Sequence, residues 1–326
     1  MKKALVLGAG GFIGSHMVKR LKKEDYYVVG VDLKKPEYSD TVADNFYISD
    51  LTNQNDFDEI LNSEDKFDEI YQYAADMGGA AYVFTGENDA DLMTNSASVN
   101  LNVLSKIKEK YNKLENLKIF YSSSACMYPE HIQEETNNPG LKEEDAYPAN
   151  PSSGYGWEKL FGEKLYYSYF KNYGLNTKIG RFHNTYGPEA PFGGEREKAP
   201  IAICRKIALA KNNEKIEIWG DGKQTRSFLF IDDNIEATRR LMESDYNSPI
   251  NIGSEEMVSI NELAEIVIKI SNKNIEIENI DGPQGPRGRN SNNELIKKVL
   301  DWDYNFSLKE GLTTTYSWVK EQISIS

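Results

Sequence analysis

A glycine-rich turn between a short apolar run and a helical pattern opens the chain and limits the folds available to it. The run "KALVLG" leads through "AGG" into "FIGSHMVKRLKK", which places Gly8, Gly11 and Gly14 three residues apart. In a strand–turn–helix unit, the first glycine permits a tight turn, the second lets backbone approach a pyrophosphate, and the third lets helix and strand pack closely. This pattern predicts a dinucleotide site at the first turn of a parallel sheet.

Apolar runs and helical patterns continue to alternate through the first half of the chain. The further runs are "YVVGVD", "NFYIS", "EIYQYAA" and "KIFYSS". Such alternation predicts an α/β fold with a Rossmann-type, doubly wound parallel sheet. The two longest helices are expected at residues 89–111 and 155–173, and their apolar residues at helical spacing could also supply the contact face of a homodimer.

The regular alternation weakens after about residue 180. Gly/Pro-rich loops are expected at 187–200 and 281–291, while "FLFIDDNIEATRRLMES" and "PINIGS" indicate one more helix and strand that rejoin the sheet. We therefore expect residues 1–180, rejoined by about 228–253, to form an NAD-binding Rossmann domain. Residues 181–326 are expected to form a smaller, interleaved α/β lobe that binds substrate.

Composition excludes several classes of protein. The 326 residues carry a net charge of −13, which disfavours nucleic acid as a partner. Two cysteines and three histidines are too few for a Cys/His metal cluster or a disulfide framework, so no metal is expected and a reducing compartment is favoured. No apolar run approaches the ~18 residues of a membrane span. We expect a cytoplasmic protein with no membrane partner.

An acidic residue ends the second strand pattern, "YYVVGVD". Asp32 can accept hydrogen bonds from both ribose hydroxyls and repels a 2′-phosphate, which favours NAD over NADP. In "SDLT", after the third run, Asp50 is expected near the adenine, although the same residues could cap a helix.

The motif "YGWEK" places Tyr155 and Lys159 on one helix face. Two other Tyr–Lys pairs share this spacing, so position decides: this pair follows the serine run that ends a strand by about thirty residues. A phenol with a pKa of about 10 is a poor base, but a nearby ammonium and a positive nicotinamide ring favour the phenolate. With Ser124 as a hydrogen-bond donor, this group can remove a carbinol proton while hydride leaves for NAD.

These motifs together resemble the extended short-chain dehydrogenase/reductase family, which acts largely on nucleotide-sugars, and the resemblance covers essentially the whole chain. It implies a cofactor site made of the glycine turn and of residues that follow the first four strands, together with the Tyr–Lys pair. The residues so implied are Gly8, Gly11, Phe12, Ile13, Gly14, Asp32, Asp50, Leu51, Ala74, Tyr155 and Lys159.

Seven blocks, in order, are similar to one subgroup of that family, the GDP-mannose 3,5-epimerases. They are "AADMGGAAY", "SSACMYPE", "IGRFHNTYGP", "GGEREKAP", "WGDGKQTRSF", "NIGSEEMVS" and "GPRGRNS". The subgroup oxidises C4 of GDP-D-mannose, exchanges protons at C5 and C3, and reduces C4 again, giving GDP-L-galactose, with the singly inverted GDP-L-gulose as a second candidate product. Once C4 is a ketone, the neighbouring C–H groups become acidic, and a low-pKa thiol can act on them.

The resemblance implies Cys126 as base and Lys198 as acid, while the face that each serves stays open. A structural thiol is the alternative for Cys126, and Cys204, in a helical pattern, is expected to be one. The implied substrate-binding residues are Gly78, Ser124, Cys126, Asn184, Lys198, Lys206, Gln224, Arg226 and Arg289. A basic cluster in the second lobe, comprising several of these with Arg205 and Arg287, is expected to meet the diphosphate.

Four other functions compete with this hypothesis. A GDP-4-keto-6-deoxymannose epimerase/reductase uses a similar Ser, Cys, Tyr and Lys but consumes NADPH, which Asp32 disfavours, and has a histidine in place of Lys198. A 4,6-dehydratase would carry Asp-Glu where this chain has Ala125-Cys126. A simple 4-epimerase needs no thiol base, and a non-catalytic NAD sensor needs none of these side chains together.

Overall fold

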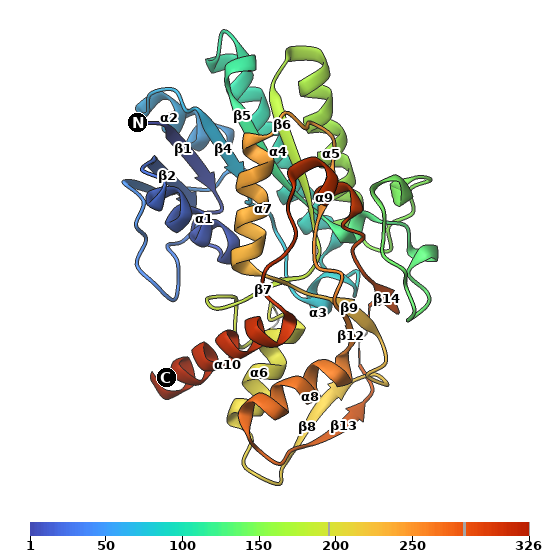
Figure 1. The fold of residues 1–326 in the computed structure, drawn as a ribbon. Helices are drawn as coiled ribbons and strands as arrows, with labels where there is room; N and C mark the ends of the chain where they lie inside the picture. The colour runs from blue at the N-terminus through green and yellow to red at the C-terminus, as the bar shows by residue number, and fades with distance from the viewer. Residues whose placement is uncertain (195, 283–284, 326) are drawn as a thin grey trace.

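A seven-stranded parallel sheet forms the centre of the computed structural model, which describes residues 1–194, 196–282 and 285–325 (Figure 1). Every neighbouring pair within it is parallel. The predicted Rossmann-type, doubly wound fold is thereby confirmed. In spatial order the strands are β11 (Ile250–Ile252), β6 (Asn176–Phe182), β5 (Lys118–Ser124), β4 (Glu69–Gln72), β1 (Lys3–Leu7), β2 (Tyr27–Asp32) and β3 (Asn45–Ile48).

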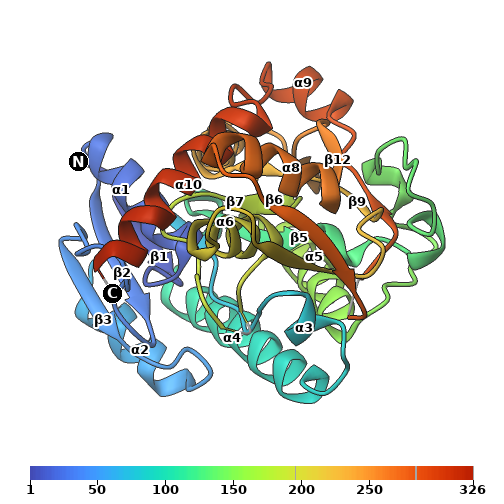
Figure 2. The same cartoon turned by 90° about the horizontal axis from the view of Figure 1, so that it is seen from below.

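Helices cover both faces of this sheet, which explains why its central strands are almost continuously apolar. On one face, α1 packs against α7, and α7 packs on β5 and β6; on the other, α4 packs against both α2 and α5 (Figures 1 and 2). The bounds are α1 (Phe12–Lys23), α2 (Gln54–Ser63), α4 (Asp89–Lys110), α5 (Gly154–Tyr173) and α7 (Ile231–Glu243). The two longest are the pair expected from the sequence.

The ends of α5 are set by local chemistry. The hydroxyl of Ser153 accepts a hydrogen bond from the backbone N–H of Gly156, and the helix stops at Gly174, whose φ of 71° suits a residue without a side chain. Tyr155 therefore lies in the first turn, and Lys159 one turn further along.

A smaller lobe lies beyond the carboxyl ends of the main strands (Figure 1). It contains the parallel pair β8–β13 and the three-stranded sheet β12–β9–β14, with α6, α8 and α10 packed together. Its elements are α6 (Ala199–Leu209), β8 (Lys215–Trp219), β9 (Thr225–Ser227), β12 (Met257–Ser259), α8 (Ile260–Ser271), β13 (Glu276–Ile280), β14 (Gly288–Arg289) and α10 (Leu308–Ile325).

The remaining elements are short. They are α3 (Ala80–Val83), β7 (Thr185–Tyr186), β10 (Leu229–Phe230), α9 (Glu294–Leu300) and four 3₁₀ turns at Leu114–Asn116, Ala125–Met127, Glu130–Ile132 and Glu143–Ala146. Between β6 and α7, the chain contributes α6, β8 and β9 to the lobe. It then returns to the main sheet, where β11 pairs with β6 at the edge. Within the described ranges, no helix is both long and apolar enough to cross a membrane.

Candidate active site

The glycine turn after β1 is a cradle with no room for side chains at its narrowest points. Gly8 has a φ of +83°, and a Cβ on Gly14 would lie 2.0 Å from the carbonyl oxygen of Gly8. Helix α1 starts directly after Gly11, and no side chain caps its first turn. The amide N–H groups there are thus left to meet an anion, and the cradle fits the pyrophosphate of NAD.

The other predicted cofactor residues follow strands whose carboxyl ends share one edge of the sheet. Asp32 ends β2, and its carboxylate accepts a hydrogen bond from the backbone N–H of Gly10 at 2.9 Å. Leu51 is buried, whereas Asp50 is exposed and accepts from Thr52, so its carboxylate stabilises a local turn. Ala74 follows β4. The structure therefore brings the predicted set together along this edge, with Phe12 and Ile13 at the start of α1.

A small cavity of about 70 Å³ opens at the glycine turn. Two later segments form its far wall, one following β2 and one following β7. Lys19 of α1 forms an ion pair with Glu189 at 2.6 Å, and Tyr38 packs edge-on against Phe192. The glycine turn is therefore bordered both by the segment that follows β2 and by Glu189, which lies 170 positions beyond its partner Lys19.

Ser124, Cys126, Tyr155 and Lys159 come together where β5 ends. The 3₁₀ turn Ala125–Met127 begins directly after Ser124, and the N–H of Cys126 donates to the Ser124 hydroxyl at 3.2 Å. Tyr155 and Cys126 belong to one apolar cluster. The Nζ atom of Lys159 donates to the carbonyl oxygen of Ser122 at 3.0 Å and lies 5.6 Å from the centre of the Tyr155 ring.

The electrostatics of this group differ from the sequence-based expectation in one respect. Burial, reinforced by the charge of Cys126, raises the pKa of the Tyr155 phenol, whereas a lowered value was expected. Burial also lowers the pKa of Lys159, against the pull of the Glu158 carboxylate. The physical reason is desolvation: both side chains are almost fully enclosed, and each environment disfavours the charged form.

The environment of Cys126 is cationic. Burial alone would raise the pKa of its thiol, but the guanidinium of Arg289, the Ser124 hydroxyl and the ammonium of Lys198 outweigh burial and lower the pKa. Arg289 donates from Nη1 to the sulfur at 3.1 Å. Burial lowers the pKa of Lys198 in turn. Both shifts move the two groups toward neutral pH, where an acid–base pair works best. Cys204, by contrast, is fully buried in α6, and burial raises its pKa.

The predicted substrate residues lie in the lobe strands and on connecting loops. Arg226 of β9 is directly opposite Arg289 of β14 in the sheet register. Asn184 adopts a φ of 42°, and its side chain donates to the carbonyl of Ser227. Gln224 is buried with Oε1 unpartnered, Lys206 donates to the carbonyl of Glu217, and Gly78 packs against Tyr82.

Two members of the expected basic cluster are neutralised by acidic residues. Arg205 donates through two nitrogens to both carboxylate oxygens of Glu197, each at 2.8 Å. Arg287 forms a similar fork with Asp221, at 3.0 and 3.1 Å. The charges of these two side chains are thus engaged by carboxylates in the structure, and contact of the whole cluster with a diphosphate stays a prediction.

Sequence reasoning missed a buried ion pair beneath the site. Arg181 of β6 donates from Nε and Nη2 to the two oxygens of Glu163 on α5, at 2.9 and 2.8 Å, and both side chains are 3% exposed. Ser123, beside Ser124, donates to the same carboxylate. An arginine within the run "IGRF", whose other members are apolar, was the available sign that a buried anion must lie opposite.

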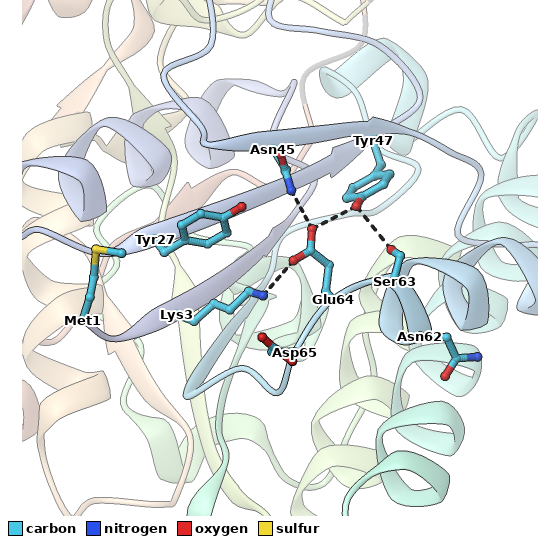
Figure 3. Close-up of a pocket in the computed structure, with 9 residues that line it drawn as sticks. All are labelled: Met1, Lys3, Tyr27, Asn45, Tyr47, Asn62, Ser63, Glu64 and Asp65. Atoms are coloured by element: carbon cyan, nitrogen blue, oxygen red, sulfur yellow. Dashed lines mark hydrogen bonds and ion pairs between the residues drawn. The ribbon is translucent and has the colours of Figure 1, made fainter.

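A larger hollow of about 570 Å³ lies at the other end of the sheet (Figure 3). Glu64 at its centre accepts from Lys3, Asn45 and Tyr47 at 2.7–2.9 Å, so its carboxylate is already engaged. It is formed where β1, β2 and β3 begin, whereas ligands of parallel sheets bind beyond the carboxyl ends. We therefore assign the active site to the glycine turn and the Cys126 region.

A doubly wound sheet with an open glycine cradle, an acid ending β2 and a Tyr–Lys pair beside the end of β5 defines an NAD-dependent enzyme of the short-chain dehydrogenase/reductase type. The chain belongs to the NAD dependent epimerase/dehydratase family, whose model matches residues 4–253. The resemblance drawn from the motifs and the predicted NAD cofactor are confirmed at this level.

Known proteins extend the likeness beyond the matched segment. A GDP-mannose 3,5-epimerase of Arabidopsis thaliana is 46% identical over 323 residues, covering 98% of this chain and 83% of that protein. The structure of UDP-glucuronic acid 4-epimerase from Bacillus cereus, with UDP-glucuronic acid and NAD, has a TM-score of 0.81 at 28% identity, covering 98% of this chain and 99% of that one. UDP-glucose 4-epimerase from Thermotoga maritima shares the fold, with a TM-score of 0.86 at 24% identity and the same coverage.

Proposed function

We propose that this protein is an NAD-dependent GDP-mannose 3,5-epimerase that converts GDP-D-mannose to GDP-L-galactose, with GDP-L-gulose as a singly inverted product. The observation that carries the proposal is the thiol of Cys126, held by Arg289 beside Ser124 and Tyr155 and within the field of Lys198. A 4-epimerase has no use for a low-pKa thiol at this point. The 46% identity to a GDP-mannose 3,5-epimerase supports the choice of substrate.

In the proposed reaction, Tyr155 accepts the proton of the C4 hydroxyl while Ser124 donates a hydrogen bond to the same oxygen. Bound NAD would supply the hydride acceptor and donor for C4 and a positive ring that favours the phenolate of Tyr155. The ammonium of Lys159, fixed on the carbonyl of Ser122, supports that negative charge. The raised pKa of Tyr155 makes its phenolate a strong base toward the C4 hydroxyl, once the neighbouring positive charges favour formation of that phenolate.

Between oxidation and reduction, Cys126 and Lys198 exchange protons at C5 and C3. Cys126 acts as the base because the surrounding cations favour its thiolate. Lys198 acts as the acid, and its lowered pKa makes the ammonium a better donor. Inversion requires removal and delivery on opposite faces. Gly78, Asn184, Lys206, Gln224, Arg226 and Arg289 are proposed to hold the nucleotide-sugar.

The test is proton NMR of GDP-mannose incubated with purified protein in heavy water, without added reductant. We expect deuterium at C3 and C5, with the C4 hydrogen retained because the hydride returns to the carbon it left. No exchange, but turnover of the 4-keto-6-deoxy sugar with NADPH, would contradict the proposal and favour the epimerase/reductase function instead.

We also propose a homodimer formed through α4 and α5. On α5, aromatic and aliphatic residues recur every fourth position from Trp157 to Tyr173, and Trp157 and Phe161 are 43% and 46% exposed. Met93 and Leu101 on the neighbouring α4 are 37% and 47% exposed. An apolar stripe across two packed helices is typical of a surface that pairs with a second copy.

Phe161→Glu is expected to convert the dimer to a monomer, because a carboxylate at the centre of an apolar interface loses its water. Sedimentation equilibrium should then give the 37.0 kDa mass of one chain in place of twice that value. Ile48→Glu, at an exposed apolar position on β3, is the matched control and should leave the dimer intact. A dimeric Phe161→Glu protein would place the interface elsewhere.

The division of the chain and its compartment complete the proposal. Residues 1–180, rejoined by about 228–253, would bind NAD, and 181–326 would form the substrate lobe; the pairing of β11 with β6 supports this interleaving. Cys126 and Cys204 are free thiols, which supports a reducing compartment such as the cytoplasm.

A further inference from the structure

Gln133 is a buried amide with every polar atom of its side chain engaged. It follows the 3₁₀ turn Glu130–Ile132 and is 1% exposed. Its Nε2 atom donates to the carbonyl oxygens of Tyr128 and Pro129, at 3.1 and 3.0 Å. Its Oε1 atom accepts from Nε of Arg289 at 2.6 Å. None of the motifs assigns this residue a role.

The two carbonyls determine which way the amide of Gln133 faces. Only the NH₂ group can donate to them, so Oε1 must lie on the opposite side, toward Arg289. The backbone reinforces this arrangement, because the N–H of Gly288 donates to the carbonyl of Gln133 at 3.0 Å. The Oε1 atom that accepts from Arg289 is therefore held in place by hydrogen bonds between the Gln133 amide and main-chain carbonyls.

Anchoring Nε orients the whole guanidinium, because the group is planar and its five N–H bonds keep fixed directions. With Nε on Gln133, Nη1 reaches the sulfur of Cys126 at 3.1 Å. The third nitrogen, Nη2, is buried and has no hydrogen-bond partner among the residues that the structure describes. The guanidinium of Arg289 thus donates to the thiol through Nη1 and keeps Nη2 available for a ligand.

Several other charges act on Cys126 and must be weighed beside Arg289. Lys198, which precedes α6, favours the thiolate, and Arg226 on β9 and Lys159 on α5 are cations within its field. The phenol of Tyr155 also lies within this field, where burial and the charge of Cys126 raise its pKa. Of these cations, Arg289 lowers the pKa of the Cys126 thiol the most, and it also donates a hydrogen bond directly to the sulfur. A change in its position should therefore have the largest effect on that pKa.

We propose that Gln133 is a positioning residue, which holds the guanidinium of Arg289 against the sulfur of Cys126 and so favours ionisation of the thiol. Gln133 does not touch the reacting atoms and acts through Arg289 alone. The role of Cys126 as an acid–base group rests on the proposed function, but the state of its thiol does not, so the two can fail separately.

The measurement is the pH dependence of Cys126 alkylation by iodoacetamide in the NAD-containing protein, followed by mass spectrometry of the modified peptide. The chain suits this experiment because it has only one other cysteine, Cys204, which is fully buried. The midpoint of the rate profile reports the thiol pKa whether or not the sugar substrate is the one proposed.

Gln133→Met, which retains the volume and removes the acceptor, is expected to raise that midpoint by about one pH unit. Asn138→Ala is the matched control. Asn138 is a buried amide of the same segment that donates to the carbonyls of Ile132 and Gly288 but does not contact the side chain of Arg289. The Asn138→Ala variant should leave the midpoint of the alkylation profile within about 0.2 pH units of the wild-type value.

An unchanged midpoint in Gln133→Met, or an equal shift in Asn138→Ala, would overturn the proposal, since either result reduces Gln133 to a structural amide. Arg289→Gln should raise the midpoint at least as far as Gln133→Met; a smaller shift would equally contradict a role exerted through Arg289. Should Gln133→Met not fold, Gln133→Asn, one methylene shorter, takes its place with the same expected direction.

Discussion

Replacing Cys126 by alanine is expected to abolish deuterium incorporation at C3 and C5 and to reduce turnover of GDP-mannose by about 10³-fold, within the range found for loss of a general acid–base group. The thiol is the group that the surrounding cations prepare for proton transfer. In the proposed mechanism, oxidation at C4 relies on Tyr155, Ser124, Lys159 and bound NAD, which this change leaves in place. Reduction of bound NAD by substrate, followed in a single turnover by absorbance, should therefore persist.

Cys204→Ala is the matched control, since that thiol is fully buried and its pKa is raised. It should leave exchange within about two-fold of the wild type. The pH dependence gives a second check with a definite sign: because the pKa of the Cys126 thiol is lowered, wild-type exchange should rise at a lower pH than it would with an ordinary thiol, whose pKa is about 8.5. Undiminished exchange in Cys126→Ala would exclude the thiol as base.

Arg181→Met is expected to lower the free energy of unfolding by about 3–5 kcal/mol, the range for a buried ion pair that loses one partner. The change leaves the buried charge of Glu163 without its ion-pair partner, and it removes donors to the Tyr128 hydroxyl and the carbonyl of Glu143. Urea unfolding, at a fixed NAD concentration because bound cofactor adds stability, measures the difference.

Two further variants test whether the loss of stability comes from leaving a buried charge unpaired. Arg240→Met, at an arginine that is 43% exposed and pairs with Glu236, should cost less than about 1 kcal/mol. The double variant Arg181→Met/Glu163→Leu removes both charges and should recover most of the stability that the single variant loses. A loss below about 1 kcal/mol in Arg181→Met would mean that the pair is not isolated from water.

The elements that local patterns determine were predictable from the sequence. The run "FIGSHMVKRLKK" coincides with α1 because a glycine turn precedes it and the basic residues Arg20, Lys22 and Lys23 occupy its last turn. The positions of Asp32, Ser124 and Tyr155 followed from the rule that parallel strands end at one edge. Even the return of the chain to the sheet was visible in "PINIGS", which contains β11.

The rest depended on contacts between distant residues. Asp221 lies 66 positions before Arg287, and no local pattern links the two, so their ion pair could not be foreseen. Gln133 meets Arg289 across 156 positions. The pKa of Tyr155 was expected to fall because charges were counted without burial, and burial is a property of the folded chain alone.

The pairing of β11 with β6 also fixes an order of events on the ribosome. When residue 182 has emerged, six strands are present, but β6 still presents an unpaired edge, and its partner is synthesised about seventy residues later. At typical elongation rates, that interval lasts several seconds. An exposed strand edge is a template for unwanted pairing. During this interval, β6, the strand that carries Arg181, exposes backbone N–H and C=O groups that could pair with another chain.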